Sequence, residues 1–561
     1  MSSAEWFIVP CSETSSSLRR ERSDFGEPTA LARSRCGMNG SAERPVVSSA
    51  ERLLLSLFRL FDRPGAHKMW DRVREARIRY ALSALVLASF ALRAYHLDFQ
   101  SLWRDEVDTI AFTTRALPRL LATFTRPKEN GPLYFLLLRP WIALTGDSEF
   151  SVRFFSLAFG VLAIPLAYAL GRRWLSPLGS MLAALLMAFS PYLIWYSQET
   201  KMYTLITFLT MLSLYLYVEA LARGQWPYWA AYVVATSFCL YTHILAALII
   251  PLEIILFVVW WPRHRARLKP WLAAIGFVTL PYIPLALWEI PLLLSSYETG
   301  HPFYPWHEIL RILFFAFSHG VSSVASPWLV ILTSILFIFL FLAGISLEDK
   351  KSNLAIGSDV WRGERVTLLL YLFLPIIGVY LISLGMPIFA ERYLIYVAPA
   401  FYLILARGLA AVKLRSKAVF ALCLALVLTL NVHSSWAQSH IKIKSDFRSA
   451  ARYFALYREP DDVVIFLMPY VRHTFEYYYR GDYYWADGPY TNEGTSEGEL
   501  EAILAEMTEG HRRIWLVASE AELWDRRGLV KAWLDGNGKL VEEEEFARVR
   551  VYRYELREEG Q

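Results

Sequence analysis

Long apolar runs separated by short polar connections fill most of the chain. Helices of about 17 to 25 apolar residues with few charges cross a bilayer, and eleven runs match or come close to that length. They are Tyr80–Tyr95, Val152–Leu170, Leu178–Tyr196, Leu205–Leu221, Trp226–Tyr241, Ile244–Trp261, Trp271–Leu294, Trp328–Ile345, Val366–Leu384, Tyr393–Leu409 and Ala418–Val432. The pattern predicts an α-helical polytopic membrane protein with about eleven transmembrane helices.

Lys and Arg cluster in alternate connections, which predicts how the chain is oriented. The basic connections are the N-terminal tail, "GRRW" from Gly171, "ARGQW" from Ala222, "PRHRARLK" from Pro262, residues 348–365 and "KLRSK" from Lys413. Short loops rich in Lys and Arg stay in the cytoplasm. We therefore expect a multi-pass protein of the cell membrane with a cytoplasmic N-terminus, and an odd number of spans places the C-terminus outside.

The two ends of the chain are polar. Residues 1–75 are rich in Ser and Arg and lack the apolar core of a signal peptide, so we expect a disordered cytoplasmic tail, with Met69 as an alternative start. Residues 76–435 form the transmembrane domain, with a long outer loop at 96–150. Residues 436–561 predict a small extracytoplasmic α/β domain, with helices at 446–458 and 497–507 and strands at 461–467, 512–519, 538–546 and 547–556.

Two segments of the outer connections are apolar but too short or too charged to be predicted as transmembrane helices. They are "GPLYFLLLRPWIALTG" at 131–146 and "WHEILRILFFAF" at 306–317. We expect both to form helices that lie along the membrane surface.

Composition agrees with a membrane protein and limits the other classes. Of 561 residues, 55% are hydrophobic and only 19% are charged, and the mean hydropathy is +0.31. The net charge of +5 is spread over the basic connections, so it does not predict nucleic-acid binding. The four cysteines contain no C-x-x-C pair, so they predict neither a disulfide framework nor a metal cluster.

The first outer loop begins with the acidic stretch "SLWRDEVDTI", which contains Asp105, Glu106 and Asp108. Such a stretch is also typical of a solvated loop or of the polar start of a helix. Further polar and charged side chains lie in the outer connections, namely Lys128, Glu129, Asn130, Lys201, His243 and Arg392. Cations at the outer face run against the positive-inside bias, which suggests an anionic partner. An acid that deprotonates an acceptor, beside cations that stabilise a departing phosphate, describes group transfer from a phosphate leaving group.

An ordered series of segments carries a resemblance to a known family. The segments are "SLWRDEVDTI", "NGPLYFLLLRPW", "SEFSVRFFSLAFGVLAIPLAYALGRRW", "SPYLIWYSQETKMY" and "ERYLIYVAPAFYLILARGL". From about Tyr80 to Arg415 the chain resembles the integral-membrane glycosyltransferases of the GT-C fold, and within them family 39, which includes protein O-mannosyltransferases and the lipid A aminoarabinose transferase. The resemblance implies that a sugar moves from a polyprenyl-phosphate carrier, with inversion, to an acceptor protein, lipid or polysaccharide on the outer side.

The resemblance also implies roles for individual residues. The Asp of the family's Asp-Glu pair, regarded as the general base, corresponds to Asp105, with Glu106 as its neighbour. The family's residues around the lipid phosphate suggest Lys201 and Arg392 here, and more loosely Lys128 and Tyr203. Glu129, Asn130, Tyr134 and His243 are candidate contacts to the acceptor or the donor.

One segment departs from the family's pattern. Many relatives carry His-Pro-Pro-Leu-Tyr where this chain has "NGPLY" from Asn130. Without that His we assign no metal ligand, while a divalent metal stays open as a cofactor. The rest of the chemistry fits the residues, because direct displacement at a sugar's anomeric carbon needs one base rather than the two catalytic carboxylates of a glycosidase.

Two other classes of function compete with this interpretation. A transporter or flippase of a lipid-linked saccharide would line a path through the bilayer with polar residues. Within the spans the main acids are Glu253 and Glu289, whereas the polar clusters lie in the outer connections, which favours surface chemistry. A non-catalytic assembly protein would use the C-terminal domain to bind a partner, and loss of transfer on replacing Asp105 would exclude it.

Overall fold

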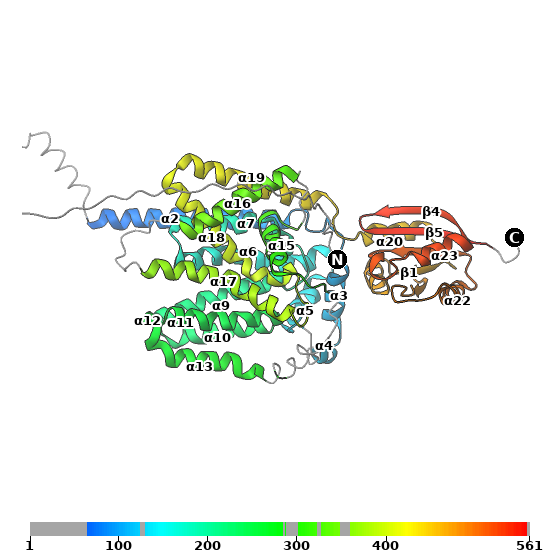
Figure 1. Cartoon of the computed structure of the whole chain (residues 1–561), viewed down its shortest axis with the longest axis horizontal. Helices are drawn as coiled ribbons and strands as arrows, with labels where there is room; N and C mark the ends of the chain where they lie inside the picture. The colour runs from blue at the N-terminus through cyan, green and yellow to red at the C-terminus, as the bar shows by residue number, and fades with distance from the viewer. Residues whose placement is uncertain are drawn as a thin grey trace, which may run out of the picture. The chain divides into compact units, whose positions relative to one another are not determined.

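Helices make up the described chain as far as residue 440, and a mixed sheet follows (Figure 1). The structure, a computed structural model, describes residues 64–123, 130–283, 287, 301–321, 327–347 and 359–557. The helices are α2 (Pro64–Ala94), α3 (Arg104–Thr114), α4 (Leu117–Thr123), α5 (Leu133–Thr145), α6 (Glu149–Trp174), α7 (Pro177–Phe189), α8 (Pro191–Ser197), α9 (Tyr203–Arg223), α10 (Trp226–Leu240), α11 (Ile249–Val259), α12 (Trp261–His264), α13 (Leu268–Thr279), α15 (Trp306–His319), α16 (Pro327–Ser346), α17 (Asp359–Ser383), α18 (Ala398–Arg415) and α19 (Lys417–His440). Short 3-10 segments between them are η1 (Ile244–Leu248), η2 (Arg265–Arg267), η3 (Leu280–Tyr282) and η4 (Glu391–Val397).

Local sequence signals fix where several of these helices begin and end. The hydroxyl of Ser148 accepts from the N–H of Ser151 at the start of α6, and Ser176 caps α7 in the same way, with Pro177 at the first helical position. Helix α9 ends at Gly224, whose φ of 70° is the left-handed conformation that glycine adopts without strain. The apolar runs therefore stop at specific polar or glycine residues.

Six helices of the described chain are long and apolar enough to cross a membrane, and up to eight do so if each of two bent pairs counts as one span. The eleven spans predicted from the sequence are not confirmed. Helix α10 has only 15 residues, and the apolar part of α2 lies between Arg77 and Arg79 on one side and Arg93 in the last turn on the other. The predicted spans that begin at Ile244 and Trp271 correspond to a single pair bent by 80°.

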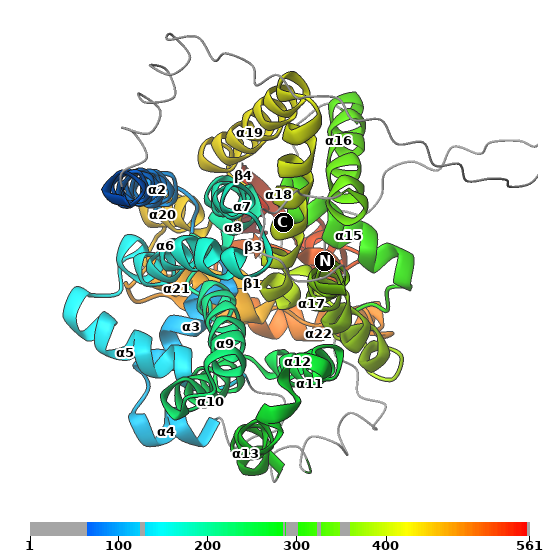
Figure 2. The same cartoon turned by 90° about the vertical axis from the view of Figure 1, so that its left-hand side faces the viewer.

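Helix α18 is the centre of the helical part. All of its residues from Ala398 to Val412 are buried, and it lies among α7, α16, α17 and α19 in the view along the helices (Figure 2). Its contact with α16 depends on two glycines, since a Cβ at Gly344 would lie 2.1 Å from the Ile404 oxygen and one at Gly408 2.0 Å from the Leu340 oxygen. Small residues allow helix backbones to approach closely in this way.

The two short apolar segments of the outer connections are helices, as predicted. Residues 131–146 contain α5 and residues 306–317 lie in α15. Helix α5 keeps Leu144 at 84% exposure and Leu137 at 40%. Their predicted position along the membrane surface stays a prediction.

A five-stranded sheet with flanking helices forms the C-terminal domain. Its elements are α20 (Phe447–Tyr457), β1 (Val463–Phe466), η5 (Pro469–Val471), α21 (Arg472–Tyr478), β2 (Tyr484–Asp487), α22 (Glu497–Thr508), β3 (Arg513–Ala518), η6 (Ala521–Leu523), α23 (Leu529–Asn537), β4 (Gly538–Phe546) and β5 (Val549–Leu556). The strand order is β2-β1-β3-β5-β4. Strands β1, β2 and β3 are parallel, and β5 pairs antiparallel with β3 and β4.

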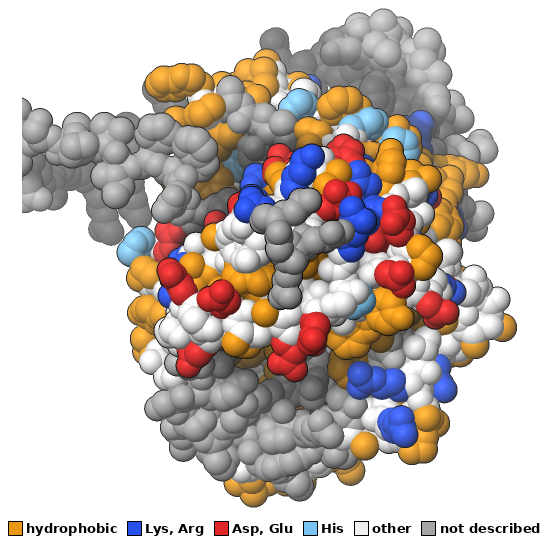
Figure 3. Space-filling model, turned by 90° about the vertical axis from the view of Figure 1, so that its right-hand side faces the viewer, with side chains coloured by type: hydrophobic (Ala, Val, Ile, Leu, Met, Phe, Trp, Pro, Cys, Tyr) orange, Lys and Arg blue, Asp and Glu red, His pale blue; other side chains and the backbone are white. Residues whose placement is uncertain are grey.

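The predicted C-terminal α/β domain is confirmed, and so are the four strands and two helices expected within it. The sequence did not predict β2, an edge strand whose four residues are mostly exposed, nor α21 and α23. Both faces of the sheet bury apolar side chains, with Phe466 and Trp515 on one face and Ile514 and Tyr554 on the other. Acidic and basic side chains are mixed over the face of the molecule seen in Figure 3, as a water-exposed surface requires.

Candidate active site

Helix α3 begins directly after Trp103 and has two adjacent carboxylates in its first turn. Acidic side chains are favoured there because the free amides of the first turn carry partial positive charge. Neighbouring residues of a helix point about 100° apart, so Asp105 and Glu106 face different surroundings. Glu106 is fully buried, whereas Asp105 is partly exposed.

The carboxylate of Glu106 is surrounded by donors from three parts of the chain. The Arg153 guanidinium of α6 donates from Nε to Oε1 and from Nη2 to Oε2, each at 2.9 Å. The Thr200 N–H donates to Oε1 at 2.9 Å, and the Lys444 ammonium donates to Oε2 at 2.9 Å. Burial opposes the charged form, but Arg153 and Lys444 outweigh it and lower the pKa of Glu106 to about 2. Glu106 is therefore a fixed, ionised group.

The carboxylate of Asp105 has no hydrogen-bond partner among the described residues, and only its main-chain oxygen accepts a bond, from Thr109 at 2.8 Å. It is close enough to interact electrostatically with Tyr203 at the start of α9 and with His301. Asp108 lies on the same helix, where burial raises its pKa and the charge of Lys201 partly offsets this effect. Asp105 and Asp108 are both partly exposed, so their carboxylates, unlike that of Glu106, can be reached by a bound molecule.

Arg392, in η4, is a half-buried cation beside the start of α3. Its guanidinium lies 5.7 Å from the centre of the Trp103 ring and 5.5 Å from that of Tyr393. The side-chain N–H groups Nε of Arg392 and Nε1 of Trp103 are both buried, and neither has a hydrogen-bond partner in the described chain. Segment η4 is held in place because Tyr196 donates to the Glu391 carboxylate at 3.1 Å. Buried donors without partners are rare, and these two suit an anionic ligand.

The turn between α8 and α9 brings Lys201 and Tyr203 to the same region. The Tyr134 hydroxyl bonds the Ser156 hydroxyl at 2.7 Å, and Ser156 in turn donates to the main-chain oxygen of Lys201 at 3.2 Å. Tyr203 packs edge-on against Tyr196, with ring centres 5.1 Å apart. Tyr134 is therefore buried below the turn, where it holds the backbone of Lys201.

Asn130 and His243 meet at a second turn nearby. The Asn130 side-chain oxygen accepts from the Ile244 N–H at 3.4 Å, and the Leu133 N–H donates to the Tyr241 oxygen at 2.9 Å. His243 caps η1 by accepting from the Leu245 N–H, and its ring centre lies 5.5 Å from that of Tyr393. The contact with Tyr393 links this turn to the surroundings of Arg392.

Gly131 allows the close approach of the two segments. A Cβ there would lie 2.0 Å from the Tyr241 oxygen, so the Gly in place of the family's first Pro fits this contact. Two predicted site residues, Lys128 and Glu129, lie outside the described residues. In the described ranges no group of three His, Cys, Asp or Glu is arranged to hold a metal ion.

Comparison with known proteins identifies the fold. No curated protein matches the chain, but residues 127–288 match the family described as dolichyl-phosphate-mannose-protein mannosyltransferase. The crystal structure of ArnT from Cupriavidus metallidurans in the apo state aligns with a TM-score of 0.51 at 12% identity, over 86% of this chain and 98% of that one. The chain has the GT-C fold. This confirms the predicted GT-C fold, and the family match over residues 127–288 agrees with the resemblance stated from the sequence.

Two further structures are similar at lower scores. ArnT from Cupriavidus metallidurans bound to undecaprenyl phosphate aligns with a TM-score of 0.47 at 13% identity, over 85% of this chain and 98% of that one. The archaeal oligosaccharyltransferase AglB from Archaeoglobus fulgidus, in complex with an inhibitory peptide and a dolichol-phosphate, aligns with a TM-score of 0.49 at 13% identity, over 85% and 74% of the two chains.

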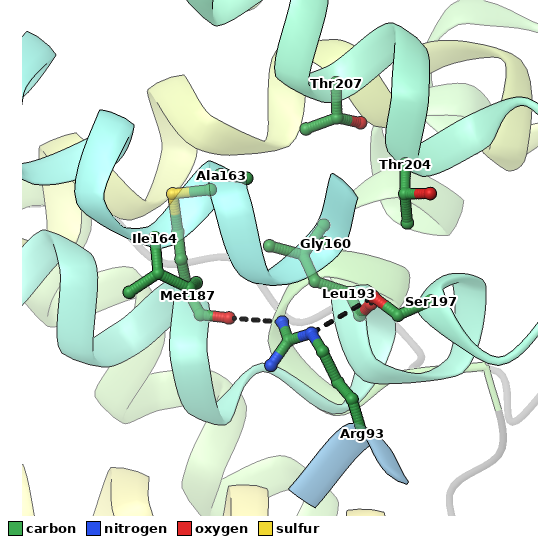
Figure 4. A pocket seen from close by; sticks show the side chains of 9 residues that line it. All are labelled: Arg93, Gly160, Ala163, Ile164, Met187, Leu193, Ser197, Thr204 and Thr207. Carbon is green, nitrogen blue, oxygen red and sulfur yellow. Dashed lines mark hydrogen bonds between the residues drawn. The ribbon is translucent and has the colours of Figure 1, made fainter. Parts of the chain in front are cut away.

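Within the GT-C helices, Arg93 supports the turn that carries Lys201 (Figure 4). Its guanidinium donates to the Ser197 hydroxyl at 3.1 Å, to the Ala188 oxygen at 2.8 Å and to the Met187 oxygen at 3.1 Å. Arg93 borders a small cavity that is otherwise mostly apolar, lined also by Gly160, Ala163, Ile164, Met187, Leu193, Ser197, Thr204 and Thr207. With its charge directed at main-chain oxygens, Arg93 has a structural role.

Four residues of the site were not predicted from the sequence: Trp103, Arg153, Glu199 and Lys444. Arg153 could have been found in the sequence, because a charge inside an apolar helix is costly and is usually paired or functional. Lys444 could not, since it lies more than 300 residues from its carboxylate partner Glu106.

Proposed function

We propose that the chain is a membrane glycosyltransferase that moves a sugar, a hexose or a pentose, from a polyprenyl-phosphate donor to an acceptor. The observation that carries the proposal is the arrangement around Trp103. The reachable carboxylate of Asp105 lies two residues after Trp103. The guanidinium of Arg392, whose buried Nε has no hydrogen-bond partner in the described chain, lies over the Trp103 ring. The match to a dolichyl-phosphate-mannose-protein mannosyltransferase family and the GT-C fold support the donor class.

In this reaction Asp105 is the general base. It takes the proton from the acceptor's hydroxyl or amide group while the acceptor atom forms its bond to the anomeric carbon. The bond from that carbon to the phosphate oxygen breaks, and polyprenyl phosphate leaves with the electron pair. A single displacement inverts the anomeric configuration, as for any direct attack from the face opposite the leaving group.

Cations stabilise the leaving phosphate. Arg392 suits this role because its planar guanidinium forms paired hydrogen bonds with phosphate oxygens, and Lys201 adds a second positive charge. Tyr203 is close enough to interact electrostatically with both Asp105 and Arg392. Lys128 completes the proposed set, and Glu129, Asn130 and His243 remain candidate contacts to donor or acceptor.

The site is proposed to face the extracytoplasmic side. It is formed by α3, the α8–α9 turn, the turn at His243 and η4, which are the connections opposite the basic ones in the sequence. The N-terminus is then cytoplasmic and the C-terminal domain extracytoplasmic. A site on that side is separated from cytosolic nucleotide sugars, which favours a donor carried by a membrane lipid.

A transporter or flippase is the alternative, and the intramembrane acid Glu253 is its main support. Ser213 donates to the Glu253 carboxylate at 3.0 Å and Tyr232 donates at 2.6 Å. Both donors are buried, so Glu253 is satisfied inside the helices instead of lining a polar path. These contacts favour a structural role for Glu253.

The proposal is tested with detergent-purified full-length protein and radiolabelled polyprenyl-phosphate sugars. A panel of hexosyl and pentosyl donors is incubated with protein, lipid and polysaccharide acceptors, and the label is followed from lipid to product. We expect time-dependent transfer from at least one donor, lost in Asp105→Asn. A protein that moves labelled lipid between leaflets of vesicles without releasing sugar would be a flippase, and the proposal would be wrong.

A further inference from the structure

Lys444 lies between α19 and α20, where the chain leaves the helical part and enters the C-terminal domain. Only 6% of its side chain is exposed. Its ammonium lies 2.9 Å from Glu106 Oε2 and 3.1 Å from Glu199 Oε1. One cation therefore joins a carboxylate of α3 to a carboxylate of the α8–α9 turn.

The two partners of Lys444 each stand next to a residue of the proposed reaction. Glu106 directly follows Asp105, and Glu199 lies two residues before Lys201. The ammonium also lies 5.2 Å from the centre of the Trp195 ring, a cation–π distance. The spacing between the base and one phosphate-binding cation thus depends on a residue of the C-terminal segment.

Charge balance makes this bridge necessary. Glu106 and Glu199 are 0% and 3% exposed, and Arg153 and Lys444 are the cations that form ion pairs with them in the described chain, while Arg392 adds a more distant positive charge near Glu199. Without Lys444, the two buried carboxylates would keep one ion-paired cation, that of Glu106, and like charges in a poorly solvated interior repel strongly. The repulsion would act between α3 and the α8–α9 turn.

Neighbouring contacts hold the same segment in place. The Gln100 side chain accepts from the Ile443 N–H at 3.0 Å and donates to the Ile441 oxygen at 2.7 Å. The Tyr478 hydroxyl of α21 accepts from the Leu102 N–H at 2.7 Å. The residues just before α3 are therefore bound to the C-terminal segment and domain by several hydrogen bonds. Lys444 adds a buried ion pair to these contacts.

We propose that Lys444 is a positioning residue that sets the distance between Asp105 and Lys201 and so couples the C-terminal domain to the site. The proposal rests on the proposed function, since it assigns Lys444 to the same transfer reaction. Lys444 touches the two structural carboxylates and does not contact the reacting atoms.

Three variants of the full-length protein test the proposal. Lys444→Met removes the cation, and Lys444→Arg keeps it. The double variant Lys444→Met/Glu199→Gln removes the cation together with one carboxylate and so restores the charge balance. Lys531→Met is the matched control, since Lys531 forms an exposed ion pair with Asp535 on the C-terminal domain.

Sugar transfer and hydrogen exchange of the α3 amides are measured for each variant. For Lys444→Met we expect kcat to fall at least about tenfold, since small displacements of reacting groups are costly, with faster exchange over residues 104–114. Lys444→Arg and the double variant should recover most of the kcat and most of the exchange protection of α3. Lys531→Met should match the wild type in both measurements. The donor KM should change less than kcat, because Lys444 pairs with Glu106 and Glu199 and leaves the Arg392 guanidinium and its positive charge in place.

Several outcomes would overturn the proposal. A Lys444→Met variant with wild-type kcat and wild-type exchange would do so. A loss of exchange protection shared evenly by all helices would also do so, because it indicates a merely structural residue. If Lys444→Met does not fold, the double variant decides, since inactivity of a folded double variant contradicts the charge-balance argument. If the wild-type protein transfers no sugar, the proposed function fails, while the exchange of α3 still tests the bridge.

Discussion

Glu106 and Arg153 form a two-point ion pair in the interior, with both nitrogen–oxygen distances at 2.9 Å, although 47 residues separate them in the chain. The pair joins the first turn of α3 to α6. Arg153 also donates to the main-chain oxygens of Leu97 and Gln100, at 3.1 and 2.7 Å. The ion pair of Glu106, the residue that follows Asp105, therefore fixes the position of the helix from which Asp105 projects.

Replacing Glu106 with Gln should destabilise the protein at neutral pH by roughly 3 kcal/mol, because it leaves buried cations without their partner. The folded-state pKa of Glu106, about 2, is below its ordinary value of 4.5. The stabilisation is thus fully present above pH 4.5 and is lost as the pH falls towards 2. Thermal unfolding in detergent should show the gap between wild type and variant closing below pH 4.5.

Glu308→Gln is the matched control for this prediction. Glu308 also pairs with an arginine, Arg311, but the arginine is 52% exposed. Exposed ion pairs contribute at most about 1 kcal/mol, so this variant should unfold close to the wild type. An equal loss of thermal stability in both variants would contradict the prediction that the Glu106 ion pair contributes more than an exposed one.

Asp105→Asn should abolish most sugar transfer while the protein still folds. The amide keeps the shape of the side chain but cannot take a proton, and a general base accounts for a factor on the order of 100 to 10,000 in rate. Asp108→Asn, the same change on the same helix, should stay within about threefold of the wild type, because Asp108 is not assigned to the chemistry. Normal turnover in Asp105→Asn would refute the assignment of the base.

The sequence was sufficient for the membrane class and the α/β nature of the C-terminal domain, because apolar runs and alternating strands are local signals. The GT-C fold was predicted from the resemblance of an ordered series of segments to a known family. The sequence was not sufficient for the number of spans, since bends such as the one at Trp261 depend on packing. The sequence predicted that Asp105 and Arg392 lie in connections on the same, outer side of the membrane. It gave no sign that Lys444 pairs with Glu106. Long-range ion pairs follow from the fold, and no local pattern of residues encodes them.

Arg392→Met should weaken binding of polyprenyl phosphate, because a charged hydrogen bond contributes about 1.5 to 3 kcal/mol, or roughly 10- to 100-fold in Kd. Arg392→Lys should fall between wild type and Arg392→Met, since lysine keeps the charge but loses the planar guanidinium that pairs with phosphate oxygens. Arg265→Met, which removes an exposed cation from a basic connection, should bind normally. Titration of the lipid phosphate into purified protein measures all three, and unchanged affinity in Arg392→Met would exclude Arg392 from the phosphate site.

The proposed orientation predicts which positions a membrane-impermeant thiol reagent reaches in intact cells. In a variant with all four cysteines changed to serine, Glu501→Cys on α22 should be labelled, because we place the C-terminal domain outside. Arg265→Cys should be labelled only after permeabilisation. Glu501 and Arg265 are both exposed, so a difference in labelling reports the side of the membrane and not burial. The reverse pattern would put the site in the cytoplasm, where soluble nucleotide sugars are available and the argument for a lipid-carried donor no longer holds.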